Sequence, residues 1–129
     1  MIRKKNVKQA VNIEIPKAGE YVLEDGRKLR IAEPNNDREK HLWVKKDKIH
    51  WPINIRSTLP GDKIAISGID GGRKSIKKYL IDKKVNRFEK EAILLVCDGD
   101  QILQIMGMRT NRDYLSSDIK NALTFKIVG

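Results

Sequence analysis

An unbroken apolar run, Ala92 to Cys97, most restricts what this chain can fold into. The run ends at the turn sequence Asp98-Gly99-Asp100, and a second apolar segment, Ile102 to Met106, follows it. This arrangement predicts a strand that is buried on both faces and paired in a hairpin with the second segment. The chain's one cysteine, Cys97, lies in the run, where a small buried thiol is favoured over a nucleophile.

Several shorter strands are predicted from alternating side chains and from turn residues. Asp25-Gly26 separates two strand-like segments, which predicts a hairpin closed by a tight type I′ turn. Leu59-Pro60-Gly61-Asp62 predicts another tight turn, and residues 67–72 predict a flexible glycine loop. The remaining strands are expected at residues 11–15, 41–44, 49–56, 63–66 and 122–128.

Two tryptophans, Trp43 and Trp51, fall in the expected strands at 41–44 and 49–56. Packing in the core is the favoured interpretation of both side chains. Stacking on RNA bases is the alternative, but it needs a neighbouring motif that the sequence does not supply.

Positive charge is concentrated in residues 72–90, where eight basic and two acidic residues give +6 of the chain's net +10. Residues 1–8 supply the other +4, and the rest of the chain is balanced. A local basic patch on a balanced domain favours a polyanionic partner, such as nucleic acid or an anionic membrane surface. A basic face that is merely solvated is the alternative.

The basic stretch also carries two helix signals. Ile76, Tyr79 and Leu80 have the spacing of one apolar stripe, which predicts a short helix with most of its lysines facing outward. After a break near Val85, Asn86 and Glu89 have the spacing of a capping box and predict a second short helix.

The bulk composition fits one folded domain. The chain has 129 residues, 40% of them hydrophobic and 34% charged, and no apolar run long enough to span a membrane. We expect a basic arm at residues 1–10 and a single domain at 11–129. The start carries no secretory signal, and one cysteine fits a reducing cytosol, so we expect a cytoplasmic location and no membrane partner.

The sequence contains no recognisable catalytic or metal-binding motif. His41 and His50 stand alone without neighbouring cysteines, so no metal site is expected. The segment 67–72 has the residue types of an ATP-binding PP-loop in the wrong order, and we reject it as a nucleotide site. The aspartates Asp62, Asp98 and Asp100 each sit in a turn beside glycine, where local hydrogen bonding is favoured over acid/base catalysis.

Four blocks of sequence then point to a known family. They are an Arg-x-x-x-Pro-Gly-Asp turn, a glycine loop leading to a lysine-rich helix, an apolar strand ending in Asp-Gly, and a Gly-Met-Arg closure, at residues 55–63, 72–85, 94–99 and 106–109. In order and spacing this region resembles the C-terminal domain of bacterial tRNA(Ile)-lysidine synthetase. Two departures are mild: Asn86 replaces a common proline and can still cap a helix, and Lys63 replaces a common arginine and keeps the charge.

The resemblance implies an α+β fold, a small sandwich-like or barrel-like β core with two or three short helices. It implies a parent enzyme that uses ATP to join lysine to the wobble cytidine of a CAU-anticodon tRNA(Ile). In that family a PP-loop domain does the chemistry and the C-terminal domain holds the tRNA, chiefly its acceptor-stem end. This chain would then lack the catalytic domain, need no cofactor of its own and be inactive alone; a homodimer formed through the parent is left open.

The candidate RNA-contacting residues follow from the basic stretch and from three cations expected on adjacent loops: Arg73, Lys74, Lys77, Lys78, Lys84, Arg87, Arg56, Lys63 and Arg109. Arg56 and Arg109 are the candidates for base recognition, with a structural salt bridge as the equal alternative. Three other functions remain open: a free-standing nonspecific RNA-binding or ribosome-associated protein, a small enzyme with an unrecognised site, and a domain that docks on its own catalytic domain through an apolar patch.

Overall fold

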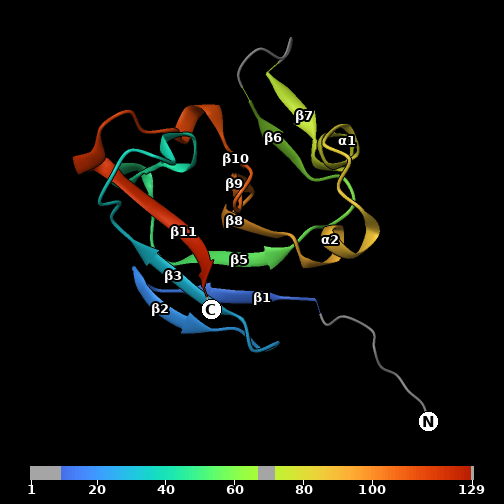
Figure 1. Ribbon diagram of the computed structural model, residues 1–129, viewed down its shortest axis with the longest axis horizontal. Helices are drawn as coiled ribbons and strands as arrows, with labels where there is room; N and C mark the ends of the chain where they lie inside the picture. The colour runs from blue at the N-terminus through green and yellow to red at the C-terminus, as the bar shows by residue number, and fades with distance from the viewer. Residues whose placement is uncertain (1–9, 67–71, 129) are drawn as a thin grey trace.

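The computed structural model describes residues 10–66 and 72–128, and within them the chain folds into three layers (Figure 1). The predicted arm lies outside the described residues except for Ala10, and so does the predicted glycine loop except for Gly72. No helix in the described part of the chain is long and apolar enough to cross a membrane.

The middle layer is a five-stranded antiparallel sheet with the order β1-β5-β8-β9-β10. It contains the predicted apolar hairpin, formed by β8 and β9. Its strands are β1 (Asn12–Ile15), β5 (Ile53–Ser57), β8 (Leu94–Asp98), β9 (Gln101–Ile105) and β10 (Arg109–Thr110). We call it the central sheet.

One face of the central sheet is covered by a four-stranded sheet with the order β2-β3-β11-β4. Its strands are β2 (Gly19–Val22), β3 (Lys28–Ala32), β11 (Ala122–Val128) and β4 (Val44–Lys45). Side chains such as Leu29, Ile31 and Phe125 meet Ile53 and Ile55 of the central sheet in the first hydrophobic core. This face therefore forms a β-sandwich.

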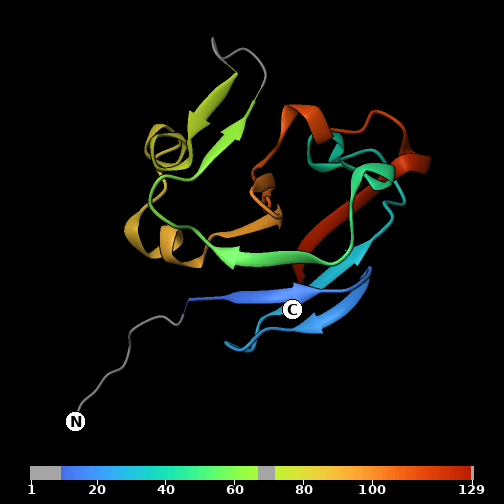
Figure 2. The ribbon, with the colours of Figure 1, turned by 180° about the vertical axis from the view of Figure 1, so that it is seen from behind.

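The opposite face is covered by a small hairpin and a helix, as Figure 2 shows from behind. The hairpin pairs β6 (Lys63–Ala65) with β7 (Arg73–Ser75), and α1 (Ile76–Asp82) follows at once. The apolar stripe of α1, which is Ile76, Tyr79 and Leu80, is buried in a second core together with Ile64 of β6. We call the hairpin and α1 together the outer layer.

Strand β8 shows why the central sheet needs both coverings. Leu94 and Val96 point into the first core, whereas Leu95 and Cys97 point into the second. Successive side chains of a strand alternate between faces, so an unbroken apolar run requires an apolar partner on each side. The prediction of a strand buried on both faces is confirmed.

The second predicted helix is also present, as α2 (Arg87–Ala92). Asn86 accepts a hydrogen bond from the Glu89 amide at 2.8 Å, and Glu89 accepts one from the Asn86 amide at 3.1 Å, which confirms the capping box. With two α-helices and a sandwich-like β core, the predicted α+β class is confirmed.

The region before β5 differs from the prediction. Residues 41–44 were expected to form a strand, but 3₁₀ turns η1 (Lys40–Leu42) and η2 (Lys46–Lys48) flank the two-residue β4. Leu42, Trp43 and Val44 are all buried in succession, which a strand with one solvent face cannot achieve. The strand expected at 49–56 begins only at Ile53.

One further detail was predicted wrongly, and one strand was not predicted. Leu23 and Arg27 are joined by a backbone hydrogen bond of 2.8 Å, so the β2–β3 loop has three residues and is no two-residue type I′ turn. Gly26 takes the left-handed conformation, at φ +93°, that such a three-residue loop needs. The basic segment before α1 forms strand β7. This strand was not predicted because two of its three residues are basic and it has no alternating apolar pattern.

The packing interpretation of both tryptophans is confirmed. Trp43 is only 2% exposed, and Trp51 is partly buried against the first core. Neither ring is therefore presented as an open platform for a base.

Candidate nucleic-acid interface

Helix α1 presents its lysines to solvent because its apolar stripe is buried. Lys77 and Lys78 lie on the turn beside the buried Ile76 and Tyr79, and both are exposed. The Ser75 hydroxyl accepts a hydrogen bond from the Lys78 amide at 3.3 Å and caps the helix. The second core thus fixes the direction in which two of the predicted RNA-binding cations point.

The register of the hairpin divides its cations between two faces. Lys63 pairs with Ser75 and Ala65 pairs with Arg73, so Lys63 and Arg73 share the outer face, where both are exposed. Lys74 pairs with the buried Ile64 and is half-buried on the inner face. Lys74 forms a salt bridge with Asp82 at the end of α1, and this contact lowers the pKa of Asp82.

Lys84 and Arg87 lie just beyond α1, and both are exposed. Together with the exposed residues of the outer layer they form what we call the basic face: Lys63, Arg73, Lys77, Lys78, Lys84 and Arg87.

Arg56 has a structural partner in the Pro-Gly-Asp turn. Its guanidinium donates two hydrogen bonds to the Asp62 carboxylate, at 2.9 and 3.0 Å. The same carboxylate accepts the Leu59 amide at 2.7 Å, which closes the turn. Burial alone would raise the pKa of Asp62, but the bonds from Arg56 and Leu59 together lower it. The salt bridge that the sequence left open as an alternative for Arg56 is therefore present.

Arg56 and Arg109 belong to one row of the central sheet. Arg56 pairs with Leu95, Leu95 with Ile105, and Ile105 with Arg109. Leu95 and Ile105 both belong to the second core, so the row faces the outer layer. With three strand spacings between them, the two arginine backbones lie about 14 Å apart. All three cations that were expected on adjacent loops, Arg56, Lys63 and Arg109, lie in strands. The strands predicted at 49–56 and 63–66 already contained Arg56 and Lys63, so the strand prediction holds for these two and the loop placement is wrong.

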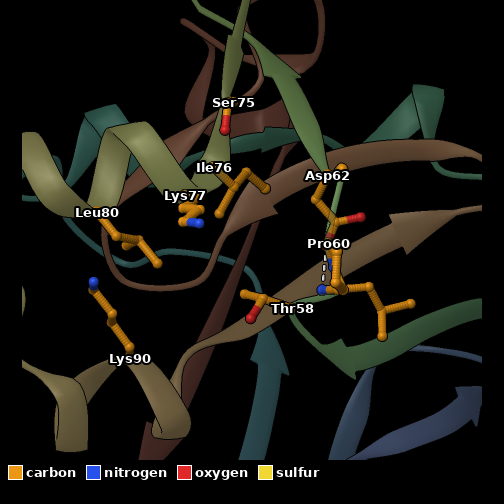
Figure 3. Close-up of a pocket in the computed structure, with 10 residues that line it drawn as sticks. Thr58, Pro60, Asp62, Ser75, Ile76, Lys77, Leu80 and Lys90 are labelled. Atoms are coloured by element: carbon orange, nitrogen blue, oxygen red, sulfur yellow. Dashed lines mark hydrogen bonds between the residues drawn. The ribbon is translucent and has the colours of Figure 1, made fainter.

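A cleft of about 440 Å³ lies where the Pro-Gly-Asp turn meets the two helices. Figure 3 shows Lys77 from α1 and Lys90 from α2 extending into it, with Thr58 on the turn side. Ile76 and Leu80 supply an apolar wall. The cleft joins two of the sequence blocks that carry the family resemblance, the turn and the lysine-rich helix.

Two cations near this surface were not among the predicted site residues. Lys90 lines the cleft, and its place in the basic stretch was the signal that could have indicated it. Arg112, in the 3₁₀ turn η3 (Arg112–Tyr114), lies against Gly72 at the start of β7, so closely that a Cβ on Gly72 would come within 2.9 Å of its Nη2. The forty residues that separate these two positions conceal this contact in the sequence.

A second hollow of about 480 Å³ lies between α2 and β11. Its walls are mainly apolar, from residues such as Ile93, Met106 and Phe125, with Glu39, Glu89 and Lys126 among the charged residues around them. The structure therefore has both a basic face and an apolar hollow. The hollow is a surface through which the domain could dock on a catalytic domain, so that alternative stays open.

The surroundings of Cys97 and Asp98, two residues considered for catalysis, do not form a catalytic site. Burial raises the pKa of the Cys97 thiol to about 11, so the thiolate needed for nucleophilic attack is scarce at neutral pH. Asp98 contacts Nδ1 of the exposed His50 at 3.1 Å. Within the described residues, no group of three or more His, Cys, Asp or Glu side chains is placed to hold a metal ion.

Comparison with known proteins identifies the domain. Residues 53–125 match the family described as the TilS substrate C-terminal domain. The chain belongs to this family. The matched region contains β5, the outer layer, α2 and the β8–β9 hairpin, and so it includes every candidate RNA-contacting residue.

Several tRNA(Ile)-lysidine synthases are similar in sequence to this TilS C-terminal domain. The enzyme of Parabacteroides distasonis is 32% identical over 102 residues, which cover 78% of this chain and 23% of the enzyme. The enzyme of Clostridium tetani is 29% identical over 124 residues, covering 90% and 26%. The chain thus spans about a quarter of the length of these relatives.

A solved structure has the same fold. The crystal structure of a TilS C-terminal domain superimposes with a TM-score of 0.71 and covers 94% of this chain and 99% of its own. Sequence identity is 21%, so the likeness supports the architecture. The three layers described above are therefore those of a TilS C-terminal domain.

Proposed function

We propose that this domain binds tRNA through the basic face and holds it, by its acceptor-stem end, for a catalytic part of a longer parent chain. The observation that carries the proposal is the outward direction of Lys63, Arg73, Lys77 and Lys78 on a layer fixed by the second core. Because the second core fixes the backbone that carries these cations, binding of phosphates has to order only their side chains and not the layer itself.

The proposed reaction and the proposed RNA substrate are inferred from the name of the relatives. A tRNA(Ile)-lysidine synthase joins lysine to a tRNA(Ile), and for this chain we propose a parent that modifies the CAU-anticodon tRNA(Ile), with ATP and lysine bound in its PP-loop domain. The C-terminal domain binds the tRNA and positions it, and no chemical step is assigned to its own residues. A dimer of the parent remains a proposal, as does a cytoplasmic location.

The test is a fluorescence-anisotropy titration of the domain with CAU-anticodon tRNA(Ile) and with initiator tRNA(Met), each at several salt concentrations. If about five phosphates are contacted, log affinity falls against log salt with a slope of about −4 to −5. Tighter binding of tRNA(Ile) would support recognition of this tRNA within the domain. Removal of the Arg109 side chain should then reduce the preference. Equal binding of both tRNAs supports a nonspecific clamp, and absence of binding contradicts the proposal.

A further inference from the structure

The connection between α1 and α2 is held by a continuous set of backbone hydrogen bonds. The amides of Lys83, Lys84 and Val85 donate to carbonyls in the last turns of α1, at 2.9 to 3.0 Å. The next amide, of Asn86, donates to the Glu89 carboxylate in the capping box. Every amide from residue 83 to 86 is therefore occupied. We call residues 83–88 the elbow.

Lys84 has an unusual conformation within this elbow. Its φ of +58° makes it the one non-glycine residue with positive φ in the described part of the chain. The bonds from Lys84 to Ile81 and from Val85 to Leu80 form the helix-ending arrangement in which this position is usually glycine. A side chain with a Cβ is disfavoured there. Lysine therefore costs stability at a position where glycine would fit better, which points to a role for its side chain.

Phe88 is the second unusual residue of the elbow. Its side chain is 77% exposed, the most exposed of the large hydrophobic residues in the described structure. Arg87 precedes it directly, and Lys84 and Lys83 come four and five residues before it, in the connection between the two helices. The nearest acid, Glu89, is engaged in the capping box. An open aromatic ring among cations is the combination that binds single-stranded nucleic acid, because a base stacks on the ring and its phosphates lie beside the cations.

We propose that the elbow binds an unpaired nucleotide of the RNA, with the Phe88 ring stacked on its base and with Lys84 and Arg87 beside its phosphates. This inference rests on the proposed function and deepens it, because the basic face alone would serve a double-stranded stem. A stacked base must be unpaired or terminal, since the bases of a continuous duplex are covered by their neighbours. The hydrogen bonds of the elbow fix the backbone from which the ring and the cations project before the RNA arrives.

The experiment compares two probes, a CAU-anticodon tRNA(Ile) with its single-stranded 3′ end and a closed RNA duplex whose ends are joined by non-nucleotide linkers, so that it has no unpaired base. Phe88→Ala is expected to weaken binding of the tRNA about ten-fold and to leave binding of the closed duplex unchanged. Phe88→Trp is expected to bind the tRNA at least as well as the unaltered domain. Val22→Ala, which trims another apolar residue of high exposure (69%) on the sandwich side, is the matched control.

Lys84→Gly separates the conformation of the elbow from its charge. Glycine relieves the positive-φ strain, so the melting temperature is expected to stay or to rise, while tRNA affinity falls several-fold because a phosphate contact is lost. A fall in both quantities would overturn the assigned role of Lys84.

The outcomes distinguish this inference from the proposed function. If the unaltered domain binds neither probe, the proposed function fails and the elbow proposal fails with it. If the tRNA binds but Phe88→Ala and Phe88→Trp leave its affinity unchanged, the basic face stands, and the ring is better explained as a contact for protein. An equal loss on both probes overturns stacking on an unpaired base.

Discussion

The two faces of the central sheet carry their charges in different ways. On the sandwich side, four cations form ion pairs with acids, Arg27–Asp25, Arg30–Glu20, Lys46–Glu33 and Lys126–Glu39. On the other side, none of the six residues of the basic face takes part in the eight ion pairs of the described residues. The six cations of the basic face are thus left available to a polyanion, whereas on the sandwich side lysines such as Lys17 and Lys28, unpaired among the described residues, lie among paired charges.

The two helices show a related difference. Helix α1 is fixed by three buried side chains, whereas none of the residues of α2 is buried. Helix α2 therefore depends on its capping box, on the elbow before it and on Arg27, which donates a hydrogen bond of 2.7 Å to the Ala92 carbonyl. The core anchors α1, and hydrogen bonds anchor α2.

The largest expected effect is on the free energy of unfolding, through the ion pair that connects the central sheet to the turn before the outer layer. Asp62→Asn removes the charge that pairs with Arg56, and both side chains are mostly buried, at 11% and 19% exposed. We expect a loss of about 3 kcal/mol in the free energy of unfolding, measured by urea denaturation at pH 7. Asp98→Asn, at another turn aspartate whose histidine partner is exposed, is the control and should cost far less.

The same variant gives a dependence on pH. Folding lowers the pKa of Asp62, so the carboxylate stabilises the fold above its ordinary pKa of about 4, and this contribution is lost as the pH falls below that value. Asp62→Asn should therefore lose less stability between pH 6 and pH 3 than the unaltered domain. An identical loss in both proteins would contradict the assigned pairing.

The second effect, on RNA affinity, tests the difference between the two sides directly. Reversing Lys77 and Lys78 to Glu should weaken tRNA binding by about 30-fold, or about 2 kcal/mol, because phosphate attraction becomes repulsion. Reversing Lys17 and Lys28 makes the same change in net charge on the sandwich side. Anisotropy titration should show little effect there, and equal losses from both pairs would mean that net charge, rather than the basic face, drives binding.

The sequence predicted the elements whose patterns are local. The apolar hairpin of β8 and β9, the stripe of α1 and the capping box of α2 each depend on residues close together in the chain. The region around Trp43 could not be predicted in this way, because its three consecutive buried residues are accommodated by contacts with distant strands. Strand β7 is only three residues long, and two of these are basic.

The candidate site likewise has features that follow from local sequence and features that depend on tertiary contacts. The exposed direction of Lys77 and Lys78 follows from the spacing of the apolar stripe, which the sequence contains. The engagement of Lys74 by Asp82, and of Arg56 by Asp62, depends on how the turns and strands meet. The contact of Arg112 with Gly72 is likewise tertiary. The sequence therefore predicts a basic surface, but it does not separate the cations engaged in salt bridges from the exposed ones.

The third prediction compares the anchoring of the two helices. Asn86→Ala removes the side chain that accepts the Glu89 amide and should cost about 1 kcal/mol. Amide exchange in α2 should become faster, while α1 keeps its protection. Ser75→Ala removes the weaker cap of α1, and the three buried residues should still protect that helix. If both variants affect only their own helix and to the same extent, the proposed difference in anchoring is wrong.

The smallest expected effect concerns the paired charges on the sandwich side. Glu20→Gln and Glu39→Gln together release Arg30 and Lys126 from their ion pairs. Because exposed pairs contribute little, the free energy of unfolding should change by less than about 1 kcal/mol in thermal melting. The tRNA affinity should rise less than about three-fold, since two released cations on a different face do not complete a phosphate-binding surface. A large rise would show that pairing, rather than position on the outer layer, decides which side of this domain binds RNA.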